Sequence, residues 1–255
     1  MQELIEFARH LAQESGRLIM QYYGTHVQVI AKPDLSPVTI ADRESEALMR
    51  RLIESHYPDH QVLGEEDGLS GKAGAEYQWV LDPIDGTRPF VHQVPLFGTL
   101  IGLLHRGEPV LGAIHIPPSG ELLIGARGHA TTLNGRPVRV RPTERLEEAT
   151  LLYTNTQTIW QQGHGAGFQR LQDRAGLVRG WGDCYWHFMV AAGRADVMID
   201  TTMKIWDVAA LKPCVDGAGG LLTDKFGKNT GVGESAISSN GRLHQQVLEL
   251  LDAKR

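Results

Sequence analysis

Hydrophobic positions near the start of the chain recur at the spacing of an α-helix. Because a helix has 3.6 residues per turn, a set of small or apolar residues here would share one face. These residues are Leu4, Ala8, Leu11, Ser15, Leu18 and Tyr22. We therefore expect an amphipathic helix over residues 2–23. A second helix is expected from about Thr39 to Tyr57, stopped by Pro58, and Thr39 followed by Asp42 resembles a capping arrangement at its start.

Short apolar runs separated by glycine and proline follow, a pattern typical of strands. The predicted strands are 78–81, 97–104, 110–116, 122–126 and 137–140. This middle portion indicates an antiparallel, sheet-rich region. From Thr150 the pattern becomes mixed, which favours layers of helix and sheet. Strands are expected near 151–154, 196–200 and 220–223, and helices around 182–192, from Asp207 and from Asn240. We expect one domain over 1–255, with a soft subdivision into residues 1–149 and 150–255.

Composition excludes several classes of partner. The formal charge of −5 comes without a basic stripe, so nucleic acid is not expected as a partner. The longest apolar stretch, residues 94–104, is too short to span a bilayer and is expected to be a buried strand. The N-terminus carries Glu3 and Glu6 rather than the basic-then-apolar layout of a secretion signal. Cys184 and Cys214 lie in apolar surroundings and are expected to be reduced thiols, so we expect a soluble, cytoplasmic protein.

The segment from Trp79 to Thr87 carries the strongest chemical signal. An apolar strand ends at Asp82, and Pro83 stops the ladder because it has no donor. Asp85 follows three residues later, so a turn can bring both carboxylates to one side. Gly86 permits tight backbone geometry, and Thr87 could begin a short helix whose free amides face an anion. The pattern indicates metal-assisted phosphate chemistry, and the alternative is a solvated acidic turn.

Two weaker acidic motifs support the same chemistry. Glu65 and Glu66 follow a probable strand and would raise each other's pKa unless a cation compensates, although a solvated loop pair is the alternative. Asp207 stands at a helix start, where a plain N-cap is the alternative. Magnesium prefers oxygen ligands of the kind these acids supply together with Asp82 and Asp85. The eleven histidines form no HExxH arrangement, so zinc is not favoured.

Four blocks of the chain resemble the inositol monophosphatase family, in its order and spacing. They are Lys32 with residues 36–42, residues 64–66, residues 82–87 and residues 206–210. The resemblance covers nearly the whole chain. It implies an α/β fold of αβαβα layers, as in the inositol monophosphatase and fructose bisphosphatase type, together with a homodimer and magnesium dependence with lithium sensitivity.

The resemblance also implies roles for individual residues. Glu65, Asp82 and the carbonyl of Ile84 would hold one Mg²⁺, and Asp82, Asp85 and Asp207 a second. Glu65 would help with a weaker third ion. Thr87, paired with Asp42, would orient and activate the attacking water, and the amides of Gly86 and Thr87 would receive the phosphate. Asp42 could instead be only a helix-start residue.

Within the family, the chain is similar to the histidinol-phosphate phosphatase branch. The similarity lies in residues 182–185, 191–196 and 94–101. Histidinol phosphate carries a cationic amine, so an acid near the leaving group would favour it. Asp183 is the first candidate and Glu234 the second, although a helix N-cap is the alternative for Asp183. Arg88 either contacts phosphate or substrate, or is a surface residue.

Some positions depart from the branch. Trp186-His187 stands where smaller residues are usual, and Asp216-Gly217 where Glu-Ala is usual. Gly163, Gly165 and Gly167 do not match a nucleotide loop and are interpreted as a flexible turn.

The sequence therefore predicts a magnesium-dependent phosphatase for a small phosphorylated metabolite, with L-histidinol phosphate as the first substrate. Inositol 1-phosphate, sugar phosphates or nucleotide 3′-phosphates are alternative substrates. A non-catalytic metal- or phosphate-binding regulator is the alternative from a different class.

Overall fold

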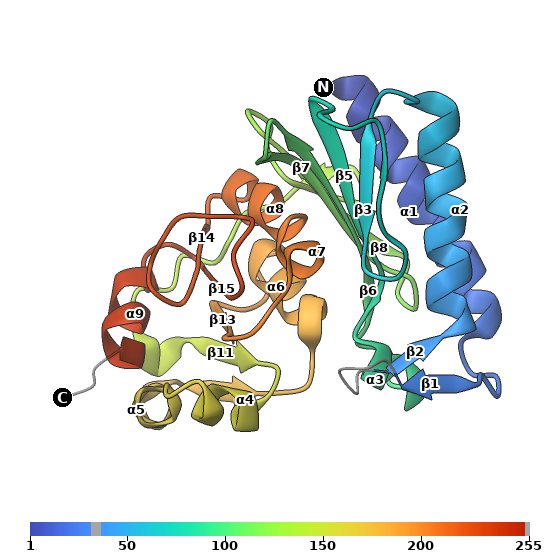
Figure 1. The fold of residues 1–255 in the computed structure, drawn as a ribbon. Helices are drawn as coiled ribbons and strands as arrows, with labels where there is room; N and C mark the ends of the chain where they lie inside the picture. Colours follow the sequence, from blue (N-terminus) through green and yellow to red (C-terminus); the bar gives the residue numbers. More distant parts are fainter. Residues whose placement is uncertain (32–36, 253–255) are drawn as a thin grey trace.

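The two N-terminal helices cover the outer face of a large sheet. The computed structural model describes residues 1–31 and 37–252, so Lys32 and Ser36 lie outside the described residues (Figure 1). Helices α1 (Gln2–Tyr22) and α2 (Ile40–His56) confirm the two predicted helices. The capping arrangement at Thr39 is also confirmed, because the Asp42 carboxylate accepts from the Thr39 amide at 2.8 Å and from its hydroxyl at 2.6 Å.

The large sheet has eight strands, antiparallel except where β3 and β5 run parallel. In order across the sheet the strands are β10 (Arg136–Pro137), β9 (Thr132–Leu133), β8 (Glu121–Ala126), β7 (Glu108–Ile116), β6 (Gly98–His105), β5 (Tyr77–Asp85), β3 (Gln61–Gly64) and β4 (Gly68–Gly71). A small separate ribbon pairs β1 (Val29–Ala31) with β2 (Pro37–Thr39). The antiparallel middle region is therefore confirmed.

A second sheet of five strands is built after residue 150. Its strands in order are β12 (Leu177–Arg179), β11 (Thr150–Tyr153), β13 (Val197–Asp200), β15 (Ala236–Ser239) and β14 (Leu221–Thr223). Between the two sheets lie α6 (Asp183–Ala191), α7 (Ile205–Val208) and α8 (Leu211–Gly217) (Figure 1). Helices α4 (Thr156–Gln161), α5 (Gly165–Arg174) and α9 (His244–Asp252) cover the outer face. The layers run α, β, α, β, α, which confirms the predicted fold class.

Several predicted boundaries were wrong. The run 137–140 is mostly not a strand, because the amides of Val138 and Val140 donate outside the ladder, to Thr131 and Ala218. The run 94–104 becomes strand only from Gly98. The terminal helix begins at His244 rather than Asn240. The helix expected from Asp207 is two short helices, α7 and α8.

The glycines near residue 165 do not form a flexible turn throughout. Gly163 lies in a turn with φ +83°, but Gly165 and Gly167 begin helix α5. A Cβ on Gly167 would lie 2.2 Å from the Leu251 carbonyl oxygen, so this glycine allows α5 and α9 to touch. Gly167 therefore serves the packing of these two helices.

The middle helices sit unusually close to the large sheet. A Cβ on Gly112 would lie 1.9 Å from the carbonyl oxygen of Ala210, and one on Gly102 would lie 2.9 Å from the Cβ of Ala209. The glycines of β6 and β7 thus admit the backbone at the α7–α8 junction. Asp207, two residues earlier, is fixed against the same sheet that carries Asp82 on β5.

Three further features bear on the sequence predictions. Among the described residues, no helix is long and apolar enough to cross a membrane. Cys184 and Cys214 are buried and free, as predicted. The sheets divide near residue 150, but the single domain with a soft subdivision stays a prediction.

Candidate functional site

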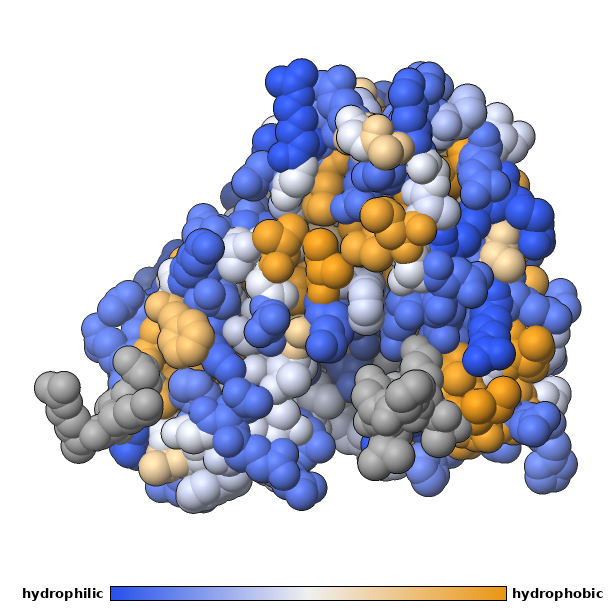
Figure 2. Space-filling model, viewed as in Figure 1, coloured by the Kyte–Doolittle hydropathy of each residue, from blue (hydrophilic) through white to orange (hydrophobic). Residues whose placement is uncertain are grey.

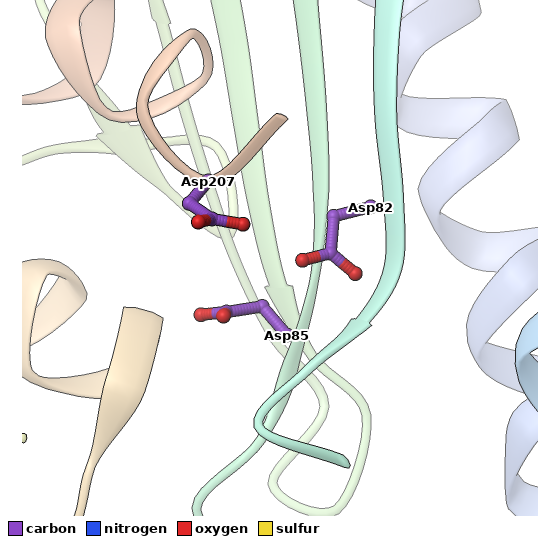
Figure 3. Close-up of side chains that lie close together, drawn as sticks. All are labelled: Asp82, Asp85 and Asp207. Carbon is purple, nitrogen blue, oxygen red and sulfur yellow. The ribbon is translucent and has the colours of Figure 1, made fainter. Parts of the chain in front are cut away.

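Three aspartates from two distant segments converge between the large sheet and α7. Asp82 and Asp85 come from the end of β5, and Asp207 comes from α7 (Figure 3). One carboxylate oxygen from each lies within 4.8 Å of the others. The predicted gathering of these acids is therefore present in the structure.

An irregularity in β5 brings Asp82 and Asp85 together. Residues three apart in a regular strand point to opposite faces. The pairing of β5 with β6 shifts between Asp82 and Asp85, and the Pro83 carbonyl turns to accept from the hydroxyl of Thr99 at 2.8 Å. The break in the ladder lets both carboxylates face the interior site.

Each aspartate keeps at least one oxygen for another partner. Asp85 accepts from the amide of Cys184 at 2.5 Å through Oδ2, and Asp207 accepts from the amide of Lys204 at 2.7 Å through Oδ2. Asp82 is only 2 % exposed, and its Oδ1 has no hydrogen-bond partner in the described structure. A buried carboxylate oxygen without a donor is costly. Its surroundings of other carboxylates suit a hard divalent cation.

Burial and mutual repulsion act on all three groups. Burial raises the pKa of Asp82 well above its usual range, and the charges of Glu65, Asp85 and Asp207 raise it further. The pKa of Asp85 is raised well above its usual range by burial and then by the charge of Asp183. Burial raises the pKa of Asp207 to about 7, although the hydrogen bond from the Lys204 amide acts to lower it. Such a cluster stays ionised at neutral pH only if positive charge enters it.

Asp42 and Thr87 meet at the edge of this cluster. The Thr87 hydroxyl lies 3.4 Å from Asp42 Oδ1 and 3.1 Å from the carbonyl oxygen of Ile84. Asp42 Oδ2 meanwhile accepts from Thr39, so the residue both caps α2 and faces Thr87. Burial raises the pKa of Asp42 to about 6, although the hydrogen bonds from Thr39 act to lower it.

Glu65 joins the site from the end of β3. Its amide donates to the carbonyl of Leu81 at 3.1 Å, directly before Asp82. The charge of Glu65 raises the pKa of Asp42, Asp82 and Asp207, so its carboxylate acts on all three acids. That Glu65 is a metal ligand stays a prediction.

Gly86, Thr87 and Arg88 form the turn below the aspartates. Gly86 adopts a left-handed backbone with φ +93° and caps the short helix α3 (Thr87–Val91), as expected for a tight turn before a helix. A Cβ at Gly86 would lie 3.2 Å from Asp183 Oδ2, which shows how close α6 comes to this turn. Arg88 is exposed, and its charge lowers the pKa of Asp183.

Asp183 is held in a strained turn that opens α6. Its φ is +38° and that of Trp181 is +68°, a region in which non-glycine residues are uncommon. Asp183 is the first residue of α6 rather than its N-cap, which is Gly182, and no side chain caps this helix. Burial raises the pKa of Asp183 to about 7, with Asp200 adding to the rise.

Asp200 is a further acid whose charge acts on this cluster, and the sequence analysis did not single it out. It ends β13, and its charge acts on the pKa of both Asp183 and Asp207. Burial raises its own pKa to about 6. The signal was available, because Asp200 follows the apolar run 197–199 just as Asp82 follows 79–81.

Glu234 is not one of the acids whose charge shifts the pKa of the three converging aspartates. It is exposed and lines a cavity of about 330 Å³ together with Thr201, Lys204 and Lys225. None of Asp82, Asp85 and Asp207 is among the described residues that line this cavity. The backbone carbonyl of Glu234 accepts a hydrogen bond from the amide of Met203 at 2.8 Å.

Comparisons with known proteins find similarity along the whole chain. The model of the inositol monophosphatase family matches residues 1–255. A histidinol-phosphatase of Chlorobaculum parvum is 39% identical over 246 residues, 96% of this chain and 95% of the relative. A fructose-1,6-bisphosphatase/inositol-1-monophosphatase of Thermotoga maritima is 30% identical over 251 residues, 97% of this chain and 95% of the relative. The solved inositol monophosphatase of Zymomonas mobilis superposes with a TM-score of 0.87 at 31% identity, covering 98% of each chain.

Proposed function

Because the chain belongs to the inositol monophosphatase family, a family of metal-dependent phosphoric monoester hydrolases, we propose that it uses Mg²⁺ to hydrolyse L-histidinol phosphate to L-histidinol and phosphate. The buried Asp82 oxygen without a donor, at the centre of the acidic cluster, carries the proposal for the chemistry. The acids Asp183 and Asp200 at its edge support the choice of substrate.

The acidic residues would hold two or three Mg²⁺ ions. Glu65, Asp82 and the carbonyl of Ile84 form one proposed ligand set. Asp82, Asp85 and Asp207 form the second, with Glu65 assisting a third. All are hard oxygen donors, as Mg²⁺ requires. When bound, the ions supply positive charge that activates the attacking water and stabilises charge on the phosphoryl group.

Asp42 and Thr87 would orient the attacking water and accept its proton. The Thr87 hydroxyl donates to Asp42, which leaves its lone pairs to accept from a water. A carboxylate whose pKa is about 6 can take a proton near neutral pH. The water oxygen bonds to phosphorus as the bond to the leaving oxygen breaks, and a proton from solvent completes the alcohol. The amides of Gly86 and Thr87 are the proposed phosphate contacts, with Arg88 beside them.

The leaving group would lie against Asp183 and Asp200. Both carboxylates are close enough to influence each other, and together they offer negative charge to a cationic amine or imidazolium. A neutral polyol makes less use of such charge. Histidinol phosphate therefore fits this edge of the site better than inositol phosphate.

A substrate panel tests this proposal. Phosphate release would be measured with Mg²⁺ on histidinol phosphate, inositol 1-phosphate, fructose 1,6-bisphosphate and adenosine 3′,5′-bisphosphate. We expect the highest kcat/KM on histidinol phosphate. A higher value on inositol or sugar phosphates would favour the second candidate, which the likeness to the fructose-1,6-bisphosphatase/inositol-1-monophosphatase supports.

The variant Asp183→Asn separates substrate choice from catalysis. Its kcat/KM on histidinol phosphate should fall by about 10-fold more than on inositol 1-phosphate, because one charge–charge contact of about 1.4 kcal/mol is lost. Glu234→Gln is the matched control, since it removes the same charge from an exposed position. Equal losses on both substrates would assign Asp183 a purely structural role.

We also propose a cytoplasmic homodimer. Figure 2 shows hydrophobic side chains gathered on the face that carries α7 in Figure 1. Ile205 and Trp206 of this helix are only partly buried. Light scattering on the purified protein should give twice the monomer mass of 28.1 kDa. A monomeric mass at micromolar concentration would contradict the dimer.

A further inference from the structure

Helix α2 carries three buried charged residues on one stripe. Asp42, Glu46 and Arg50 are spaced four apart, so they lie above one another on the same face. All three are buried, which is rare for charged side chains unless they are paired. Asp42 faces Thr87, as described above. The next two residues along the stripe face the loop that carries Glu65.

Glu46 holds the backbone that follows Glu65. Its Oε2 accepts from the amide of Glu66 at 2.8 Å, and its Oε1 accepts from the amide of Asp67 at 3.0 Å. The side chain of Glu46 is fully buried. A buried carboxylate that binds two consecutive amides fixes the path of the loop, because no water can replace either bond.

Arg50 completes the anchor. Its Nε donates to Glu46 Oε1 at 2.8 Å, its Nη1 to the hydroxyl of Ser70 at 2.7 Å, and its Nη2 to the carbonyl of Gly68 at 2.5 Å. The guanidinium thus neutralises the charge of Glu46 and also binds β4, the strand that follows this loop. Residues 66–68 of the loop are therefore bound to one helix.

The fit leaves no room for the loop to shift toward α2. A Cβ on Gly64 would lie 2.1 Å from Glu46 Oε1, so the backbone before Glu65 rests directly on this carboxylate. The amide of Glu65 is meanwhile bound to Leu81 of β5. Glu65 is therefore held from both sides.

We propose that Glu46, supported by Arg50, is a positioning residue that sets metal affinity by holding Glu65 beside Asp82. The inference rests on the proposed function, in which Glu65 is a metal ligand. The two carboxylate oxygens of Glu46 accept from the loop amides and from Arg50, so it would act on the metal site through Glu65. Loss of a residue that orients a metal ligand typically costs about 10- to 100-fold in metal affinity or activity.

The test is the variant Glu46→Gln. Glutamine has nearly the same shape, but one of its two terminal atoms is a donor, so the Glu66 amide or the Asp67 amide loses its acceptor. We expect the Mg²⁺ concentration at half-maximal activity to rise about 10-fold. kcat at saturating Mg²⁺ should stay within about threefold of wild type, because the ligands themselves are intact.

Asp196→Asn provides a matched control. Asp196 is also a fully buried carboxylate, and it accepts from Arg141 at 2.9 Å and from the amide of Thr150 at 2.8 Å. It serves the second sheet, away from Glu65. Its variant should lose thermal stability as Glu46→Gln does, but its Mg²⁺ midpoint should not change.

Direct Mg²⁺ binding by calorimetry, on the same purified proteins, separates the two claims. A higher Kd for Mg²⁺ in Glu46→Gln, but not in Asp196→Asn, supports the inference. Equal Kd values in wild type and Glu46→Gln, or equal weakening in both variants, would overturn it. If wild type binds Mg²⁺ but releases no phosphate from any substrate, the proposed function fails instead. If Glu46→Gln does not fold, Arg50→Lys is the second variant, because it removes the guanidinium contacts with Gly68 and Ser70. The Kd for Mg²⁺ should then rise as well. An unchanged Kd in Arg50→Lys would contradict the inference.

Discussion

Asparagine in place of Asp82 is expected to lower kcat by about 10³-fold or more. In the proposed mechanism Asp82 is shared by both ligand sets, so its loss disturbs the positive charge on both sides of the phosphoryl group. Several kcal/mol of transition-state stabilisation correspond to this loss at about 1.4 kcal/mol per factor of ten. The measurement is phosphate release at saturating Mg²⁺ and substrate.

The same variant should be more stable than wild type when metal is absent. The folded state holds the pKa of Asp82 far above its unfolded value, so the folded state binds more protons there. Stability therefore falls as pH rises above about 4, and the penalty is present at pH 7–8. Removing the carboxylate removes that penalty. A raised Tm with EDTA, together with lost activity, would show that catalysis and folding oppose each other at this residue. Near-normal activity would contradict the ligand assignment.

Thr87→Ala is expected to lower kcat by about 100-fold or more, with a small effect on Mg²⁺ affinity. The variant removes the hydroxyl that lies between Asp42 and the proposed water, and general-base catalysis is typically worth 10²–10⁴-fold. Single-turnover phosphate release is the measurement, because it reports chemistry rather than product release.

Thr87→Ser provides the control for this loss. Serine keeps the hydroxyl and removes only a methyl group, so activity should remain within about 10-fold of wild type. Equal losses in the alanine and serine variants would mean that the methyl group, rather than the hydroxyl, is what the site needs.

Much of the fold follows from local sequence patterns. The amphipathic spacing from Leu4 to Tyr22 and the apolar strand ending at Asp82 both act within one element, so the sequence determines them directly. Strand β15 was missed because its residues 236–239 include two serines, which are uncommon in a central strand. Those serines are buried only because Ser238 pairs with His187 at 2.7 Å and Ser239 with His244 at 2.8 Å. His187 is distant from Ser238 in the sequence, so this pairing cannot be recognised from the local pattern.

The candidate site divides in the same way. Asp82, Asp85 and Thr87 share one segment, and the strand-to-helix turn that joins them can be recognised without the fold. Asp200 follows an apolar run and could have been singled out, but Glu46 could not be placed from sequence alone. Glu46 looks like one more charged residue on an amphipathic helix, and only the packing of the 65–68 loop against α2 gives it a function. Long-range contacts of this kind determine which acids matter.

In the proposed function, the acidic cluster works only with a divalent cation. The decisive measurement is phosphate release from histidinol phosphate before and after removal of metal with EDTA, and again after Mg²⁺ is restored. We predict that release falls to background with the chelator and returns with added Mg²⁺. Release that continues at an undiminished rate in excess EDTA would contradict the account.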